Sequence, residues 1–193
     1  MLRPFPIILA LAAFPFVPEL PPSWITLANN IGLAALVAIG LVLLTGVGGM
    51  TSFAQAAFVG FGAYTTAVLT TVHGLSPWVA LPASLAVTGL GALVIGAITV
   101  RLSGHYLALG TIAWAVSIYY LLGSMPLLGR HGGLSGIPPL SIGPIDFADS
   151  RSFYLLLWVV LLLVIVMTAN LLDSRFGRAI RALRGGTVVA PSF

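Results

Sequence analysis

The polar groups that could bind a solute gather in one stretch of this 193-residue chain, residues 45–64. Three glycines within residues 46–49 interrupt an apolar run, and Thr51, Ser52 and Gln55 follow within one helical turn. Irregular backbone at membrane depth is tolerated only where it is buried in protein or lines a wet cavity. Helix N-termini at such breaks can face the polar groups of a transported solute. The stretch is therefore a candidate transport pathway, and the alternative is a cytoplasmic turn in which Thr51 or Ser52 caps the next helix.

The sequence lacks the residue motifs that are typical of catalytic and metal-binding sites. The chain has no cysteine and no lysine, its three histidines are far apart, and no charge lies inside a predicted segment apart from Arg101 at an edge. A phosphate-binding loop, a zinc-protease motif and a nucleophile elbow are all absent from the sequence. Ion-driven carriers usually hold a titratable group in mid-membrane, although backbone carbonyls could still bind Na⁺. We predict a non-enzyme with no catalytic residue, no metal and no cofactor.

A cluster of arginines follows the last apolar segment. Phe176, Ile180 and Leu183 fall on one side of a helical projection, and the basic residues occupy the rest; these are Arg175, Arg178, Arg181 and Arg184. This pattern predicts an amphipathic helix along the inner membrane surface, in contact with membrane lipid. A simple topology anchor explains the charges equally well. Residues 173–193 are thus predicted to form a cytoplasmic amphipathic tail.

The composition indicates that the helices carrying these groups lie in a lipid bilayer. Hydrophobic residues make up 59% of the chain and charged residues 6%, against roughly 25% charged in soluble domains. Most of the net charge of +4 lies in one tail, whereas a nucleic-acid surface needs a distributed basic face. We therefore predict an integral membrane protein that binds no nucleic acid.

A helix needs about 20 apolar residues to cross the hydrocarbon core, and that length predicts an all-α polytopic bundle of about six transmembrane segments. The predicted segments are residues 5–17, 24–44, 52–72, 77–100, 106–122 and 153–172. The first is short and follows Arg3, so a signal peptide is its alternative interpretation, although residues 18–22 make a poor cleavage site. Glycine and alanine recur in the segments, and tight packing of a bundle is the simpler explanation for any one glycine.

Counting back from a cytoplasmic tail places the Arg101 loop inside and residues 124–151 outside. The outer loop is charge-balanced, with two arginines and two aspartates. Its segment 129–139 is rich in glycine and proline, which indicates a structured turn or a flexible connector. Docking of a substrate-delivery protein is a further interpretation of this segment.

Four blocks of sequence resemble a known family. Residues 46–64 resemble the block GYTGQLSLGHAAFFGIGAY of branched-chain amino acid ABC importer permeases, and more specifically of the second of their two membrane subunits. Three further stretches match in the family's order: residues 101–111 resemble RLRGLYLAIVT, 132–138 are similar to TNGLSGIP, and 174–184 resemble SRFGRALRAIR. Together the blocks cover about residues 25–190.

The resemblance implies a permease in the bacterial inner membrane with its C-terminus in the cytoplasm. Its partners would be a sister permease subunit, two cytoplasmic ATP-binding subunits and a periplasmic or lipid-anchored substrate-binding protein. The cargo would be a branched-chain amino acid or a relative such as urea or an amide. The implied pathway residues are Thr51, Ser52, Gln55, Gly60, Gly62 and Tyr64. The four tail arginines would contact the cytoplasmic partner.

The chain departs from the family pattern near its end. Family members continue with an AAExxG segment that docks into the ATPase, but here Pro191 stands where the glutamate is expected. Proline also disfavours a helical Ala190. We therefore expect residues 1–193 to form a single, truncated transmembrane permease domain. The alternative is a stand-alone passive channel or a non-catalytic membrane assembly protein.

Overall fold

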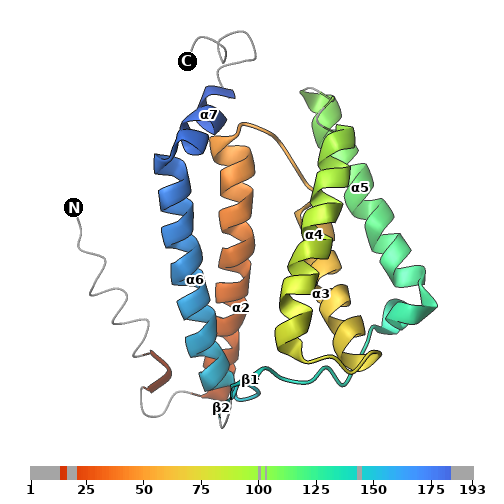
Figure 1. Ribbon diagram of the computed structural model, residues 1–193, viewed down its shortest axis with the longest axis vertical. Helices are drawn as coiled ribbons and strands as arrows, with labels where there is room; N and C mark the ends of the chain where they lie inside the picture. Colours follow the sequence, from red (N-terminus) through yellow and green to blue (C-terminus); the bar gives the residue numbers. More distant parts are fainter. Residues whose placement is uncertain (1–13, 17–20, 100, 103, 143–144, 184–193) are drawn as a thin grey trace. The chain divides into compact units, whose positions relative to one another are not determined.

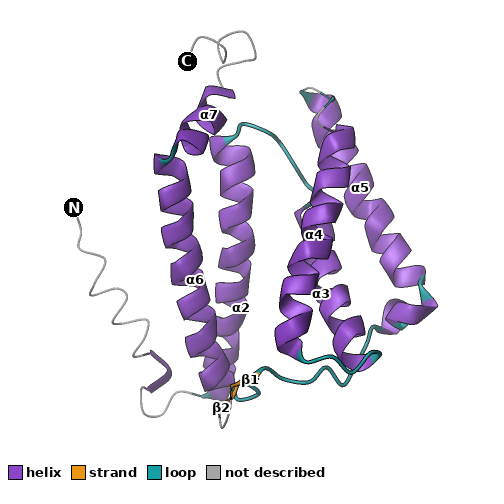
Figure 2. Cartoon of the chain, viewed as in Figure 1, coloured by secondary structure: helices purple, strands orange, loops and turns teal. Residues whose placement is uncertain are grey.

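The computed structural model describes residues 14–16, 21–99, 101–102, 104–142 and 145–183. It divides the chain into two compact units, residues 1–43 with 141–193, and residues 44–140. Both are helical (Figures 1 and 2), and within the described ranges the extended structure is one antiparallel pair of two-residue strands, β1 (Ser141–Ile142) and β2 (Ile145–Asp146). The protein is thus an all-α bundle of membrane-type helices.

The first unit is built on two long helices that run side by side in the same direction (Figure 1). They are α2 (Pro22–Leu41), which continues as a π-helical segment to Val47, and α6 (Ser150–Asp173). The Asn29 side-chain amide donates to the Ser150 carbonyl at 3.1 Å, and one turn further along, the Leu157 side chain covers Gly32. Ile25 of α2 and Tyr154 of α6 are among the most deeply buried side chains.

Asp149 begins α6 as its N-cap. Its carboxylate accepts hydrogen bonds from the backbone N–H groups of Arg151 and Ser152, which satisfies donors that the first turn of a helix leaves free. At the other end, Ser174 separates α6 from the short helix α7 (Arg175–Leu183), and its hydroxyl accepts from the Gly177 N–H at 3.3 Å. One polar residue therefore ends the membrane helix and begins the basic one.

The second unit contains α3 (Gln55–Thr71), α4 (Pro77–Thr99) and α5 (His105–Ser124). The helices α3 and α4 form an antiparallel hairpin, and α5 packs on α3. Its core brings together one residue from each helix, Ala57, Ile95 and Ile118, with aromatic and aliphatic side chains packed around them. Two 3-10 turns, η3 (Pro126–Leu128) and η4 (Arg130–Gly132), follow α5.

Glycines mediate the close helix contacts of this unit. A Cβ at Gly91 would lie 2.9 Å from two ring carbons of Phe61, and one at Gly60 would lie 3.1 Å from Leu122 Cδ1. In lipid, helices gain stability mainly by such close approach, since lipid tails are as apolar as the side chains. These contacts agree with the prediction that the glycines serve close helix packing.

The helices carry the features that lipid requires. Large apolar side chains point away from both units, with Leu85 at 74% and Leu93 at 70% exposed. Hydroxyls within the helices donate back to their own backbone, as Thr66 does to the Gly62 carbonyl at 2.9 Å and Thr99 to the Ile95 carbonyl at 2.7 Å. Such bonds satisfy polar groups where no water is available.

Five of the six predicted segments correspond to helices whose ends agree within a few residues. Four of these helices are long and apolar enough to cross a membrane: Pro22–Val47, Pro77–Thr99, His105–Ser124 and Ser150–Asp173. The helix α3, with 17 residues, is slightly shorter. The first predicted segment, residues 5–17, lies largely outside the described residues, and only Phe14–Phe16 is seen, as a 3-10 turn. A total of six segments thus stays a prediction.

Candidate functional site

The glycine-rich break is an ordered turn that leads into α3. Gly48 is buried, Gly49 adopts a left-handed conformation with φ of 68°, and the Met50 N–H donates to the Leu44 carbonyl at 3.2 Å. A positive φ of this size is easily reached only by glycine. The turn is followed by extended chain that reaches α5, where the Phe53 N–H donates to the Thr111 hydroxyl at 3.1 Å.

The polar residues after the break do not cap the next helix. The N-cap position of α3 is held by Ala54, without a side-chain cap bond. The Ser52 hydroxyl instead accepts from the Ala54 N–H at 3.4 Å, and Thr51 is exposed. The alternative interpretation of Thr51 or Ser52 as the helix cap is therefore wrong, because the helix begins one turn later than the polar residues suggest.

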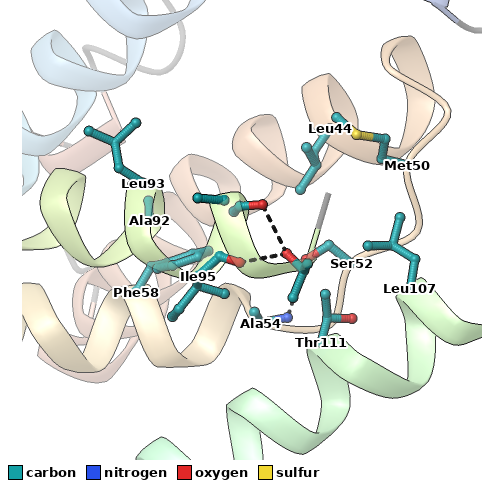
Figure 3. A pocket seen from close by; sticks show the side chains of 13 residues that line it. Leu44, Met50, Ser52, Ala54, Phe58, Ala92, Leu93, Ile95, Leu107 and Thr111 are labelled. Carbon is teal, nitrogen blue, oxygen red and sulfur yellow. Dashed lines mark hydrogen bonds between the residues drawn. The ribbon is translucent and has the colours of Figure 1, made fainter. Parts of the chain in front are cut away.

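A cavity of about 520 Å³ opens beside this turn (Figure 3). It lies where α3 begins, α4 ends and α5 begins, and its walls are mostly apolar. Its hydroxyls come from Ser52, Thr99 and Thr111. Thr99 and Thr111 donate their protons to carbonyls of their own helices, and the Thr111 oxygen also accepts from the Phe53 N–H, so these hydroxyls can offer the cavity acceptor lone pairs but no donor. The site suits an apolar group with one or two hydrogen-bond donors.

The structure spreads the six predicted pathway residues over several surfaces. Ser52 lines the cavity of about 520 Å³, whereas Gly60 and Tyr64 line a smaller one of about 230 Å³ between α3 and α5. Gly62 faces α4, where a Cβ would lie 3.4 Å from the Thr88 hydroxyl. Gln55 is half-buried in the first turn of α3. Their role in a pathway stays a prediction, and these positions do not all border one cavity.

Two cavity-lining residues, Thr111 and His131, could not be predicted as site residues from the sequence. Thr111 lies in the second turn of the apolar helix α5, where a lone threonine gives no signal. His131 comes from the outer loop, and its ring lies against Gly123, where a Cβ would meet the Nδ1 atom at 2.9 Å. The glycine-rich setting of His131 indicated a turn, but nothing in the sequence told which helix the turn covers.

The arginine helix is held against the end of α6. Gly177 is buried, and a Cβ there would meet the carbonyl oxygens of Leu171 and Leu172. The Arg178 guanidinium donates to the Asp173 carbonyl at 3.1 Å, and that of Arg181 donates to the Leu172 carbonyl at 2.9 Å. Carbonyls at a helix C-terminus lack partners within the helix and carry partial negative charge. Both arginines therefore stabilise the end of the membrane helix.

The remaining predicted features of the tail are partly described. Arg175 is exposed, and the Phe176 side chain is 75% exposed beside it. The side chain of Leu183 and all of Arg184 lie outside the described residues. The predicted helix exists, and its placement along a membrane surface stays a prediction.

Long apolar helices with outward-facing aliphatic side chains define a multi-pass membrane protein. Residues 23–191 match the family described as "Branched-chain amino acid transport system / permease component", and the chain belongs to this transport family. This confirms the resemblance drawn from the four sequence blocks. The match includes every helix from α2 to α7 except the first residue of α2.

Two curated relatives carry the description "High-affinity branched-chain amino acid transport system permease protein LivM". The chain is 27% identical to the protein of Salmonella typhimurium and 26% identical to that of Escherichia coli, over 181 residues in each case. The alignments cover 81% of this chain but 43% of each relative, so the chain spans less than half of their length. No solved structure gives a significant match.

Proposed function

We propose that this chain is a membrane-spanning subunit of an ATP-driven importer that translocates branched-chain or related amino acids. The observation that carries the proposal is the family match over residues 23–191, which includes the glycine-rich break, the three-helix unit and the basic helix. The chain itself has no nucleotide-binding loop and no lysine to build one. ATP hydrolysis therefore belongs to two cytoplasmic partner subunits, and a sister permease and a periplasmic or lipid-anchored binding protein complete the importer.

We further propose that the C-terminal helix lies in the cytoplasm. Because α2 and α6 run in the same direction (Figure 1), an odd number of crossings must separate them, and α3, α4 and α5 provide three. Arg101 and the arginines of α7 then share one side, which the excess of basic residues marks as cytoplasmic. This assignment makes α3 a crossing helix in spite of its 17 residues, which span about 25 Å.

The absence of cysteine from the sequence makes this orientation easy to test. We expect a His73→Cys variant, placed between α3 and α4, to react with a membrane-impermeant maleimide added to intact spheroplasts. An Arg101→Cys variant should react only after the membrane is permeabilised. The reverse labelling pattern would place the basic helix on the external side. Labelling of both variants in intact spheroplasts would contradict the proposed orientation of the helices as membrane crossings.

The pathway in this proposal passes the polar turn after the break and the α3 face that follows it. The residues that we assign to it are Thr51, Ser52, Gln55, Gly60, Gly62 and Tyr64. Support comes from the two cavities that border Ser52 at one end of α3 and Gly60 and Tyr64 farther along. Arg175 and Arg184 are the arginines that we assign to the cytoplasmic partner, and Arg178 and Arg181 contribute to the same surface while they hold α7 on α6.

Uptake measurements test the function as a whole. The full chain would be co-expressed with its sister permease, ATPases and binding protein in a bacterial strain that lacks its own branched-chain importers, and uptake of radiolabelled leucine would be measured. We expect accumulation above the external concentration. The matched control replaces the P-loop lysine of the ATPase, and accumulation should then disappear. Equilibration without accumulation, unaffected by that control, would favour a passive channel instead.

A pulldown separates the two roles of the arginines. We expect Arg175→Gln to weaken capture of the ATPase subunits while α7 stays folded on α6. Arg178→Gln and Arg181→Gln should weaken capture and also loosen α7, visible as faster hydrogen exchange of residues 175–183. Unchanged capture in all three variants would show that the basic helix is not the contact surface.

A further inference from the structure

The loop after α5 folds back as an ordered cap over the ends of α3 and α5. Its turns are closed by backbone bonds from Gly129 to the Pro126 carbonyl at 3.1 Å and from Gly133 to the Arg130 carbonyl at 3.2 Å. Gly129, Arg130 and Gly133 all have positive φ. A Cβ at Gly129 would meet the Gly133 carbonyl oxygen, so the tight turn depends on glycine. The segment is thus a structured turn, one of the two forms that its composition indicates.

The cap places two side chains on either side of Tyr64. Leu128 is 6% exposed and lines a shallow pocket on one side of α3. His131 lies on Gly123 and borders the cavity of about 230 Å³ between α3 and α5. The cavity has an apolar wall that includes Ala57, Ile118 and Leu122, and the His131 imidazole and the phenols of Tyr64 and Tyr119 provide polar groups.

We propose that this cavity is a binding site for a single free amino acid with a branched aliphatic side chain, closed on one side by His131. The inference rests on the proposed importer function and assigns it a substrate site. The apolar wall takes the aliphatic side chain, and the imidazole and the phenols hydrogen-bond the carboxylate and amino groups. The volume lies below the roughly 300–1,000 Å³ of sites for drug-sized ligands, which favours a solute of a few heavy atoms.

The position in the fold agrees with such a role. The cavity borders the first half of α3 and the last half of α5, and His131 comes from the loop after α5, which is external in the orientation proposed above. A solute released by a binding protein would therefore meet His131 and Tyr64 first. The cavity of about 520 Å³ borders the start of α3 and the start of α5 and is almost entirely apolar apart from three hydroxyls. It offers fewer partners for a charged amino acid.

Binding by the purified full chain in lipid nanodiscs tests the site without its partner subunits. Radiolabelled leucine is the probe, and unlabelled leucine, alanine and isovalerate are the competitors. Ala115 lines the cavity, so Ala115→Phe fills it, and we expect leucine affinity to fall about tenfold or more. The matched control is Ala113→Phe on the same helix, at an exposed position outside the cavity, which should bind leucine as the unmodified chain does.

Loss of binding in Ala115→Phe could also result from misfolding, so a second variant, His131→Ala, removes a side chain instead of adding one. We expect this variant to lose affinity for leucine about tenfold, and leucine to compete better than alanine or isovalerate in the unmodified chain. Equal binding by the Ala115→Phe and Ala113→Phe variants would overturn the site. If leucine accumulation in cells persists in that case, the importer function stands without this site. If accumulation is absent as well, the proposed function fails too.

Discussion

The two units of the chain use different kinds of helix contact. In the unit of α2, α6 and α7, the contacts that bind the helices include hydrogen bonds from side chains to backbone carbonyls, from Asn29 to Ser150 and from Arg178 and Arg181 to the end of α6. In the unit of α3, α4 and α5, the helices pack closely against Gly60 and Gly91, and cavities lie beside the helices. We infer that the first unit anchors the chain and that the second offers room for a solute.

This difference has a physical cause. A hydrogen bond to a backbone carbonyl fixes the position of one helix along the axis of another. Contacts at small residues instead set the distance between two helices, because they allow the backbones to approach closely. Hydrogen bonds to backbone carbonyls therefore suit the first unit, in which the basic helix α7 is held on the end of α6.

The largest effect is expected at the elbow between α6 and α7. In Gly177→Ala the new methyl group meets backbone carbonyls of Leu171 and Leu172, which cannot rotate away as a side chain can. We expect docking of α7 to weaken by about 2 kcal/mol. Since a nine-residue helix is marginal by itself, hydrogen exchange of residues 175–183 should accelerate strongly. Unchanged exchange would mean that the elbow does not hold the basic helix.

A second prediction concerns the glycine contact within the three-helix unit. Gly91→Ala places a methyl group 2.9 Å from the Phe61 ring, and we expect a loss of about 1–2 kcal/mol in the free energy of unfolding. The matched control is Gly96→Ala on the same helix, where a Cβ meets nothing within 4 Å. That control should be neutral or slightly stabilising because alanine favours helix. Unfolding by SDS in mixed micelles measures both, and equal values would remove glycine packing as the basis of this unit.

The corresponding contact of the other unit should be more tolerant. Gly32→Ala brings a methyl group within 2.7 Å of Leu157 Cδ2, the far end of a flexible side chain. We expect a loss of about 0.5–1 kcal/mol, smaller than for Gly91→Ala, because Leu157 can change rotamer while Asn29 keeps the helices in register. The same SDS titration gives the value. A larger loss than at Gly91 would reverse the proposed contrast between the two units.

The smallest effects are expected at buried polar atoms without partners. Among the described residues these include the Thr88 hydroxyl and the Asn29 side-chain oxygen. Thr88→Val removes an unsatisfied group, so we expect stability to rise slightly, by at most about 0.5 kcal/mol. Asn29→Leu removes an unsatisfied oxygen but also the bond to Ser150, and a net loss of about 0.6 kcal/mol is expected. A loss above that of Gly32→Ala would show that the polar tie, not the glycine contact, determines the α2–α6 pair.

Much of the architecture could be predicted because its signals are local. The length and apolar content of the segments predicted α2 to α6 within a few residues, and the periodicity of residues 175–183 predicted α7. The predicted start of α3 at Ser52 is too early, since the Ser52 hydroxyl accepts from the Ala54 N–H in a turn and the helix begins only at Gln55. A capping residue and a turn residue have the same chemistry, so the sequence could not separate them.

The candidate site was less predictable, because its residues come from separate helices. Gly60 and Tyr64 border a cavity that is completed by α5 and by His131 of the following loop, more than 60 positions further along the chain. Two residues from Gly60, Gly62 faces a different helix. No pattern within residues 45–64 distinguishes these two directions.

By itself, the sequence determined that the protein lies in a membrane, the approximate extents of helices α2 to α6, and to which family it belongs. Only the tertiary structure decided which glycines form contacts, which hydroxyls face a cavity, and that two of the tail arginines cap α6. The reason lies in the solvent. A helix in lipid is apolar on every side, so hydropathy marks its length but not the face that meets protein, and that face emerges only when the helices pack.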